Sequence, residues 1–556
     1  MNVMCRALLI LLCVAAAAAQ IRRGGPQRQP TAPGDAGIEG IVADATTHEP
    51  IKKAQVVLNG PISPRLMAAS DAGGHFAFRD LPAGAYWLSA TKAGYNQPQS
   101  VLGVEPVSQV SVGAEEQKKG VEIDLVPGGV ISGHVVTEDG IPVSGCQIAA
   151  AQQSYEQNRP VLRNTQTANT GDKGEYRLHN LAPGRYYVFE HCRQLLPAAH
   201  PLLPPGDPRT PHETYQPQFY GGGLDPAAAT RLNVTAGGNL EDIDFRVTRV
   251  ASLTVSGSVT ASEPAALTGF VNVQLMPASL LMRDLMMTGA GVVPGGHRFQ
   301  IRSVTPGSYR LVAFAMHDGR MFAAQRVIEI GTTPPDPEEI SLAGGADLQG
   351  TVQFDASDQP SPQIGSIALF PLEAPLFVPQ PHAEVEADGS FTLTGVMPGH
   401  WRLNVGLAGY PKSVTLGGQP VSPYDIPIGP GASGPLHILM TSKMADLQLT
   451  VEDAPAGGQV SVLVYPEDAS RRGAGLDRAS VGSSNGEIGI GDLPPGRYRV
   501  LATDLANPWS LLQRPDLLEA LLGHTMAVDV PESGQVSATV GLIPHEELAK
   551  IVADKQ

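Results

Sequence analysis

The chain has 556 residues, which allows four or five domains of ordinary size. Glycine (62 residues) and proline (49 residues) make up about one residue in five, and only 17% of the residues are charged. This balance excludes a coiled coil, a collagen and a large helical bundle, and it favours short strands joined by tight turns. The formal net charge of −16 excludes nucleic-acid binding through neutralised phosphates.

Residues 1–19 are typical of an export signal. Arg6 supplies the positive charge, residues 7–16 are apolar, and three alanines before Gln20 form a cleavage site. The apolar run is shorter than the ~18–20 residues that span a membrane. A lipoprotein signal is disfavoured because a leucine, not a small residue, precedes Cys13. We expect an exported protein, periplasmic or extracellular, with residues 20–36 as a flexible linker and no membrane span after signal removal.

Two motifs then recur about every hundred residues. The first is a short strand with an apolar residue, a glycine and a valine at alternate positions, as in Ile38-Glu-Gly40-Ile-Val42; the fifth copy has Leu449 instead of the glycine. The second is a hairpin in which an aromatic residue (Ile488 in the fifth copy) precedes a turn glycine by eight residues. The five turn glycines are Gly84, Gly184, Gly307, Gly399 and Gly496.

The turn chemistry predicts one hairpin geometry for all five copies. Proline sets φ before the turn glycine, and glycine accepts the positive φ that follows. The aromatic residue two positions later points into the core, and its successor points outward. A module of about 100 residues can bury its own core. We therefore predict an all-β chain of five tandem Ig-like or transthyretin-like β-sandwiches, connected as a string of beads with limited hinge motion.

The motif positions give the expected boundaries. The five sandwiches span residues 37–127, 128–249, 250–343, 344–443 and 444–545, and residues 546–556 form a tail. The second sandwich carries a long proline-rich excursion over residues 193–230. The last sandwich carries one short helix over residues 514–523, where proline stands near the start and glycine at the end.

The recurring motifs resemble the carboxypeptidase regulatory-like domain. The Gly-x-Val opening, the Asp-x-Gly-x-aromatic hairpin and the Leu-x-Pro-Gly-x-Tyr turn carry the resemblance, which covers roughly residues 37–545 and is weakest in the third module. It implies a transthyretin-like β-sandwich of the kind grouped with carbohydrate-binding-like folds. The whole chain is similar to exported proteins of soil bacteria that are built from such arrays. The motifs specify a fold far better than a function.

The sequence lacks the patterns of common active sites. None of the 14 histidines has a glutamate three residues later, as a zinc carboxypeptidase requires. Residues 482–486 match Gly-x-Ser-x-Gly, and residues 89–92 match Ser-x-x-Lys. The first match lies in a hairpin turn and the second at a strand end, so neither predicts a nucleophile. The chain contains no Gly-Lys dipeptide and hence no P-loop. We expect no catalysis, no cofactor and no metal.

Other special chemistry is also disfavoured. Internal Lys–Asn isopeptide bonds would require a lysine in the first strands, and none recurs there. Calcium at Asp71, Asp172 or Asp388 is less favoured than capping of the local backbone by these turn aspartates. Two cysteines remain after signal removal, Cys146 and Cys192. In an oxidising compartment they favour a disulfide at the root of the excursion, and two separate buried thiols are the alternative.

Aromatic residues give the main indication of a binding site. Among the outward residues that follow the inward aromatics, only Trp87 and Tyr187 carry rings. Together with Tyr215, Phe219 and Tyr220 on the excursion, they would form a stacking platform for sugars or a groove for a partner chain. The alternative, which we favour, is that the excursion folds over the sheet and covers these rings.

These features predict a non-catalytic protein for binding or scaffolding at the cell envelope. The family resemblance implies carbohydrate as the leading ligand class, and an envelope protein is the second candidate partner. One alternative is a mechanical spacer or adhesin-like stalk without a small ligand. Another is a regulatory partner of a separately encoded envelope hydrolase.

Overall fold

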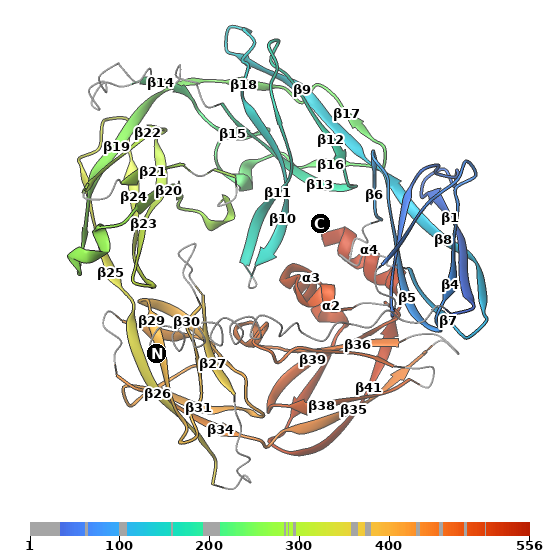
Figure 1. The fold of residues 1–556 in the computed structure, drawn as a ribbon. Coiled ribbons are helices and arrows are strands. Elements are labelled where there is room, and N and C mark those ends of the chain that lie inside the picture. The colour runs from blue at the N-terminus through green and yellow to red at the C-terminus, as the bar shows by residue number, and fades with distance from the viewer. Residues whose placement is uncertain are drawn as a thin grey trace, which may run out of the picture. The chain divides into compact units, whose positions relative to one another are not determined.

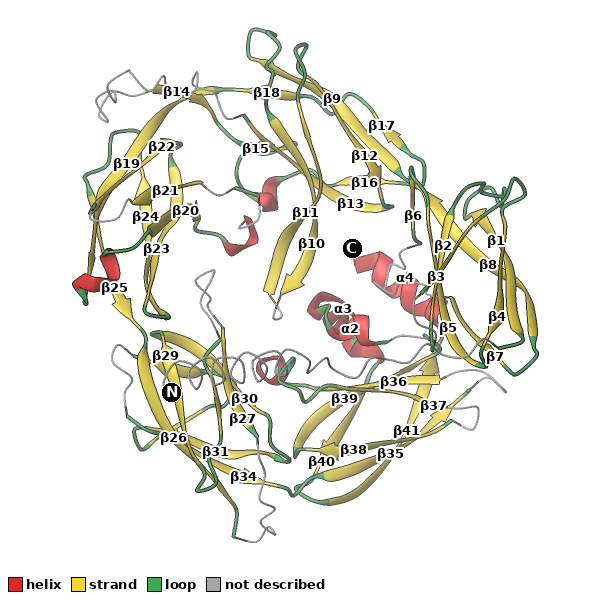
Figure 2. Ribbon diagram, viewed as in Figure 1, coloured by secondary structure: helices red, strands yellow, loops and turns green. Residues whose placement is uncertain are grey.

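The structure is a computed structural model that describes residues 34–61, 65–98, 108–156, 159–192, 212–282, 285–286, 288–292, 296–356, 365–372, 380–429, 434–454, 460–482, 486–505 and 508–555. The expected signal peptide, most of the linker and the proline-rich part of the excursion lie outside these residues. Strands dominate the structure, as Figure 2 shows. The described residues form two compact units, one ending at Gly128 and the other beginning at Gly129.

The first unit is a sandwich of two four-stranded sheets, ordered β4-β1-β8-β6 and β3-β2-β5-β7. Its strands are β1 (Ala36–Asp44), β2 (Gln55–Asn59), β3 (Leu66–Ala69), β4 (His75–Leu81), β5 (Gly84–Thr91), β6 (Tyr95–Asn96), β7 (Ser108–Val112) and β8 (Gln117–Pro127). Alternate residues of both sheets, such as Ile38, Val56 and Tyr86, share one buried core. The predicted period of two therefore builds the sandwich.

The second unit begins with the second and third modules (Figure 1). The second module has the sheets β11-β10-β13-β15, with β16 beside β13, and β12-β9-β17, with β18 beside β9. The third has the sheet β14-β19-β25-β24-β23-β20-β21, with β22 beside β19. The elements are β9 (Gly129–Thr137), β10 (Gln147–Glu156), β11 (Arg159–Asn169), β12 (Glu175–Leu181), β13 (Gly184–His191), β14 (His212–Tyr215), β15 (Gln218–Phe219), η1 (Pro226–Ala228), β16 (Leu232–Val234), β17 (Asn239–Leu240), β18 (Phe245–Val247), β19 (Arg249–Ala261), η2 (Pro264–Leu267), β20 (Val271–Pro277), η3 (Leu280–Met282), β21 (Thr288–Val292), β22 (Arg298–Val304), β23 (Gly307–His317), β24 (Arg320–Ile330) and β25 (Glu338–Gly344).

The fourth and fifth modules complete the unit. The fourth has the sheets β29-β26-β34-β31-β32 and β28-β27-β30-β33, and the fifth has the sheet β37-β36-β39-β41-β35-β38, with β40 beside β39. The elements are β26 (Ala346–Phe354), β27 (Ser366–Pro371), β28 (His382–Glu384), β29 (Ser390–Val396), β30 (Gly399–Val405), β31 (Tyr410–Leu416), β32 (Gln419–Val421), β33 (Ile426–Ile428), β34 (Leu436–Thr441), β35 (Ala445–Glu452), β36 (Val460–Pro466), η4 (Ala469–Arg471), β37 (Arg478–Gly482), β38 (Glu487–Leu493), β39 (Gly496–Thr503), α2 (Trp509–Leu512), α3 (Pro515–Ala520), η5 (Leu522–His524), β40 (Met526–Val530), β41 (Gly534–Ile543) and α4 (His545–Lys555).

One pairing scheme recurs in all five modules. The first strand pairs antiparallel with the first hairpin strand and parallel with the last strand: β1 with β4 and β8, β9 with β12 and β18, β19 with β22 and β25, β26 with β29 and β34, β35 with β38 and β41. The pairing of the first strand with the first hairpin strand has one register shift, where one residue of the hairpin strand has positive φ. These residues are Asp80, Asn180, Ser303, Gly395 and Asp492. The repeated scheme confirms the predicted tandem all-β modules.

The hairpin turn has the predicted conformation. The five turn glycines have φ between 146° and 157°, a region that favours glycine. The aromatic residue two positions later is buried in every module. Its polar group donates to the carbonyl oxygen four residues earlier: Tyr86 to Pro82, Tyr186 to Ala182, Tyr309 to Thr305, Trp401 to Met397 and Tyr498 to Pro494. The inward ring therefore satisfies its only polar group and fixes the turn.

The first-strand glycine makes room for the hairpin aromatic. Gly40 lies opposite Phe76, and a side chain on the glycine would collide with that ring. In the fifth module both positions change, because Leu449 lies opposite the smaller Ile488. The substitution in one strand is thus compensated in the other, and the pair still fills the core.

Modules of the second unit share hydrophobic clusters. The expectation of separate beads, each with a core of its own, is therefore wrong for these modules. Tyr187 and Phe189 of the second module lie in one hydrophobic cluster with Leu253 and Val255 of the third. Ala323 of the third module lies in the core cluster of the fourth. The short connections were sufficient to predict neighbouring modules, but not the apolar surface that these modules bury between them.

Helices pack on the outer face of the last module, where Figure 2 shows α2, α3 and α4 beside β36 and β39. Helix α3 confirms the predicted short helix, with Pro515 at its first position. The expected tail instead forms α4, and its Leu548 is buried in a cluster with Leu463 and Leu501. Among the described residues, no helix is long and apolar enough to cross a membrane.

Candidate functional site

The predicted aromatic platform is largely covered. Tyr187 points away from the core of its own sandwich, but it is only 8% exposed, and Phe219 is 1% exposed. Strand β15 pairs with β13, which places the Phe219 ring centroid 6.0 Å from that of Tyr187 and 4.9 Å from that of Phe189. The platform prediction is therefore wrong for Tyr187 and Phe219, because the excursion folds over the sheet and buries both rings.

The remaining excursion rings also make structural contacts. Tyr220 is half-buried, and its ring lies edge-on to Phe245 with centroids 5.9 Å apart. Tyr215 is half-buried on β14, which pairs with β19 of the third module. Its hydroxyl hydrogen-bonds to Arg249 and raises the pKa of that guanidinium. The excursion thus joins the second module to the third.

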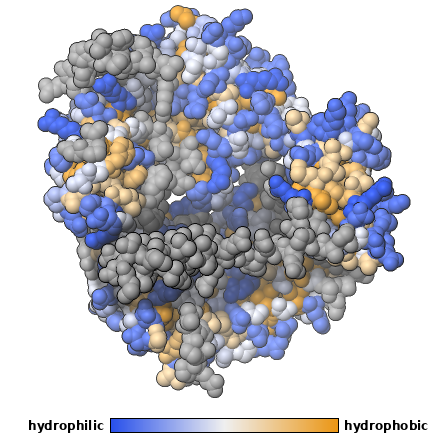
Figure 3. Space-filling model, viewed as in Figure 1, coloured by the Kyte–Doolittle hydropathy of each residue, from blue (hydrophilic) through white to orange (hydrophobic). Residues whose placement is uncertain are grey.

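Trp87 is the predicted ring that remains open, and it lies in the first unit. The face of the molecule in Figure 3 mixes hydrophilic residues with smaller hydrophobic areas, so an exposed ring alone is unremarkable in a protein surface. Trp87 is 43% exposed on the outer face of the β3-β2-β5-β7 sheet, where it lies opposite Asn59. On the same face, exposed Met67 pairs with Val57. These four residues, Trp87, Asn59, Met67 and Val57, are called the Trp87 face below.

Cys146 and Cys192 are joined in a disulfide, with Cα atoms 4.0 Å apart. Cys146 precedes β10, Cys192 follows β13, and both are buried in the core of the second module. The bond therefore ties two neighbouring strands together at the point from which the excursion leaves.

A buried glutamate lies beside this disulfide. Glu190 has no exposed surface, and neither of its carboxylate oxygens makes a well-formed hydrogen bond within the described residues. Burial raises the pKa of the Glu190 carboxyl to about 8, although the Cys192 N–H and the Gln218 amide partly oppose the shift. A carboxylate oxygen and the two sulfur atoms lie within 4.8 Å of one another. The sulfur atoms are bonded to each other, so neither is available as a thiolate ligand.

Sequence reasoning missed Glu190, although its position gave a signal. The inward Tyr186 fixes the inner face of its strand, and Glu190, four residues later, has the same parity. A charged residue at an inward position of a predicted strand is rare and informative.

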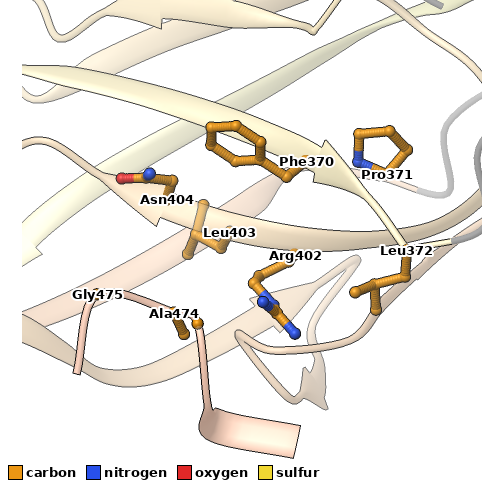
Figure 4. Close-up of a pocket in the computed structure, with 9 residues that line it drawn as sticks. Phe370, Pro371, Leu372, Arg402, Leu403, Asn404, Ala474 and Gly475 are labelled. Carbon is orange, nitrogen blue, oxygen red and sulfur yellow. The ribbon is translucent and has the colours of Figure 1, made fainter. Parts of the chain in front are cut away.

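A cavity of about 270 Å³ lies between the fourth and fifth modules. Figure 4 shows its lining from β27 and β30 on one side and from the segment with Ala474 and Gly475 on the other. Arg402, on β30, points toward that segment, and its Nε is buried without a hydrogen-bond partner among the described residues. Burial lowers the pKa of the Arg402 guanidinium; Asp477 opposes the shift and Arg159 adds to it. Arg402 holds the outward position that directly follows the inward Trp401.

Several predicted motifs have local structural roles. The Asp71 carboxylate accepts hydrogen bonds from the backbone of Gly73 and His75, and the Asp388 carboxylate accepts them from Ser390. Both aspartates therefore cap turns, which was the favoured alternative to calcium binding. The centre of the Gly-x-Ser-x-Gly match, residues 483–485, lies outside the described residues.

Comparison with solved structures finds likenesses of low identity. The Bacillus anthracis TIE protein is 13% identical over 55% of this chain, with a TM-score of 0.17, and this chain covers 50% of that one. GBS52, the minor pilin of Streptococcus agalactiae, is 16% identical over 39% of this chain and 97% of its own, with a TM-score of 0.22. BcpA, the major pilin subunit of Bacillus cereus, is 10% identical over 73% of this chain and 98% of its own, with a TM-score of 0.14. No function is inferred from these likenesses.

Among curated proteins, no match to the chain was found. The family model of the carboxypeptidase regulatory-like domain matches residues 37–125. These residues form the first sandwich, in which the Gly-x-Val opening and the turn, here Leu81-Pro82-Ala83-Gly84-Ala85-Tyr86, have the geometry described above. The resemblance predicted from the motifs is thus confirmed for residues 37–125, the part of the chain that this family model matches.

Proposed function

We propose that the chain is a non-catalytic exported scaffold that binds carbohydrate at the cell envelope through the Trp87 face of its first module. The single observation that carries the proposal is the exposed indole of Trp87, which lies on the outer face of a sheet rather than in a core. The family match of residues 37–125 supports the assignment, since that fold is grouped with carbohydrate-binding-like folds.

The Trp87 face offers the two kinds of contact that a sugar ring requires. One side of a pyranose carries mainly C–H groups, which pack on an aromatic ring, while hydroxyl groups at its edge seek hydrogen-bond partners. Asn59 lies directly opposite Trp87 on the neighbouring strand and has an exposed amide. Met67 and Val57 extend the apolar surface along the sheet. Several sugar units would therefore find a nearly flat platform here.

A second candidate function, the mechanical spacer, is favoured by a different observation. The second, third and fourth modules share hydrophobic clusters, whereas separate beads would each keep a core of their own. Such cores stiffen the connections between modules, and stiffness is what a spacer requires.

A glycan array with purified residues 20–556 tests the proposal. We expect binding of one or more neutral glycans, and at least tenfold weaker binding after Trp87→Ala. Trp509→Ala is the matched control, because Trp509 is 49% exposed in the last module and its loss should leave the signal intact. Equal binding by both variants would reject the Trp87 face. No glycan signal, with an extended rigid particle in small-angle scattering, would favour the spacer.

A further inference from the structure

An arginine recurs at one position in the last three modules. Arg310, Arg402 and Arg499 each follow the inward aromatic residue and point away from the sandwich core. The strand beside each arginine ends in a proline, and the residue after that proline makes the same hydrogen bond in all three modules. Its backbone N–H donates to the carbonyl oxygen of the residue that follows the turn glycine: Ala278 to Ser308, Leu372 to His400 and Glu467 to Arg497, at 2.8–3.0 Å. Ala278, Leu372 and Glu467 therefore occupy equivalent places beside the three arginines.

In the fifth module the residue at this position, Glu467, neutralises the charge of Arg499. Arg499 Nη2 lies 2.7 Å from Glu467 Oε1, and Arg497 Nε lies 2.8 Å from Glu467 Oε2. The hydrogen bond from Arg499 lowers the pKa of the Glu467 carboxyl, so the carboxylate stays ionised. A carboxylate at this position thus neutralises the charge of the outward arginine, although Arg499 Nε, like Arg402 Nε, has no hydrogen-bond partner among the described residues.

In the fourth module the equivalent carboxylate is missing. Leu372 stands where the fifth module has Glu467. His400, the counterpart of Arg497, pairs with Asp425 at 2.7 Å, whereas Arg402 has no ion pair among the described residues. A half-buried cation without a carboxylate is costly, and here it borders a cavity.

The nearby charges leave Arg402 available. Asp477 is the acid that acts on Arg402, but no ion pair joins the two among the described residues. Burial raises the pKa of the Asp477 carboxyl, and a hydrogen bond from the Gly473 N–H at 2.6 Å opposes that rise. Arg159 adds a second positive charge nearby. Gly473 lines the same cavity, and a Cβ built on it would stand 3.5 Å from Arg402 Nη1, so its backbone lies directly beside the guanidinium.

We infer that the Arg402 cavity binds a uronic acid unit, whose carboxylate pairs with Arg402 as the Glu467 carboxylate pairs with Arg499 in the fifth module. A cavity of about 270 Å³ has room for one monosaccharide. Phe370 and Leu372 offer apolar surface, and Asn404 offers an amide to hydroxyl groups. The inference rests on the proposed carbohydrate function, but it concerns a second site with its own specificity.

Saturation-transfer NMR and calorimetry with full-length mature protein test this site with glucuronate, its methyl ester and glucose as probes. We expect glucuronate to bind at least tenfold more tightly than the ester or glucose. Arg402→Gln should abolish that preference. Leu372→Glu should abolish it too, because it places a carboxylate beside Arg402 as the fifth module does. Arg310→Gln, at the equivalent position of the third module, is the control that should keep the preference.

The outcomes are distinct. Equal binding of glucuronate and glucose, or an unchanged preference in folded Leu372→Glu protein, would overturn the inference. Neutral glycans bound through Trp87 without any preference for glucuronate would overturn it while leaving the proposed function intact. Failure of every neutral and acidic glycan to bind would overturn both. Circular dichroism of each variant establishes that the fold is retained.

Discussion

Glu190 should make the stability of the second module depend strongly on pH. Its carboxyl group is fully buried beside the Cys146–Cys192 disulfide, and its pKa rises from 4.5 to about 8 on folding. The unfolded chain therefore releases the proton at a lower pH than the folded chain does. For a raised acid pKa of this kind, stability is greatest below pH 4.5, falls as pH rises to about 8, and then levels off.

The size of the effect follows from these two pKa values. One pKa unit corresponds to about 1.4 kcal/mol of differential interaction. At pH 5 about three quarters of the unfolded chains already carry an ionised Glu190, and the penalty for keeping this carboxyl protonated in the folded chain is about 1 kcal/mol. At pH 7 the penalty reaches about 3 kcal/mol, because the unfolded carboxyl is then fully ionised. Between pH 5 and pH 7 this residue should therefore remove about 2 kcal/mol of stability.

Glu190→Gln removes the titrating group and keeps the shape of the side chain. We expect the variant to lose the fall in stability between pH 5 and pH 7. Hydrogen exchange of peptides from β10 and β13, measured at several pH values without reductant and corrected for intrinsic exchange, reports on this module directly. Glu175→Gln, an exposed change in β12, should keep the wild-type profile. A Glu190→Gln profile as steep as that of the wild type would refute the reasoning.

Three further predictions concern contacts within the second unit: the docking of α4, the disulfide of the second module, and the packing of Phe219 between the second and third modules. The hydrogen bond to Asp504 raises the pKa of His545. Burial alone would raise the pKa of Asp504, but the hydrogen bonds from His545 outweigh it and lower that pKa. Docking of α4 should be firmest from about pH 4 to pH 6.5 and weaken on either side, and Asp504→Asn should flatten this profile in hydrogen exchange. Replacing Cys146 and Cys192 by serine opens a 46-residue loop and should cost about 4 kcal/mol in urea denaturation; an unchanged midpoint would contradict this. Phe219→Ala should cost about 3–5 kcal/mol and increase proteolysis near β14, whereas unaltered cleavage would mean that Phe219 does not hold the joint.

The inward residues of this chain could be predicted from the sequence because their spacing is periodic. Tyr86 and its four counterparts stand at a fixed distance from a turn glycine, and each is buried with its polar group satisfied. Contacts between modules have no such period. Tyr187 is outward in its own sandwich, and only the folded excursion shows that Phe219 covers it. Glu190 is intermediate between these two kinds of residue. The alternation of the strand predicts that its side chain points inward, but nothing in the sequence predicts that its carboxylate has no hydrogen-bond partner among the described residues.

The outward position after the inward aromatic has therefore diverged while the scaffold has stayed the same. In the first module it carries Trp87, which remains open. In the second it carries Tyr187, which is buried in the joint with the third module. In the fifth it carries Arg499, whose charge Glu467 neutralises. In the fourth module it carries Arg402, which lies beside Leu372 and lines a cavity. Because burial of the inner face already stabilises each sandwich, this outer position is free to serve as binding surface, joint or ion pair.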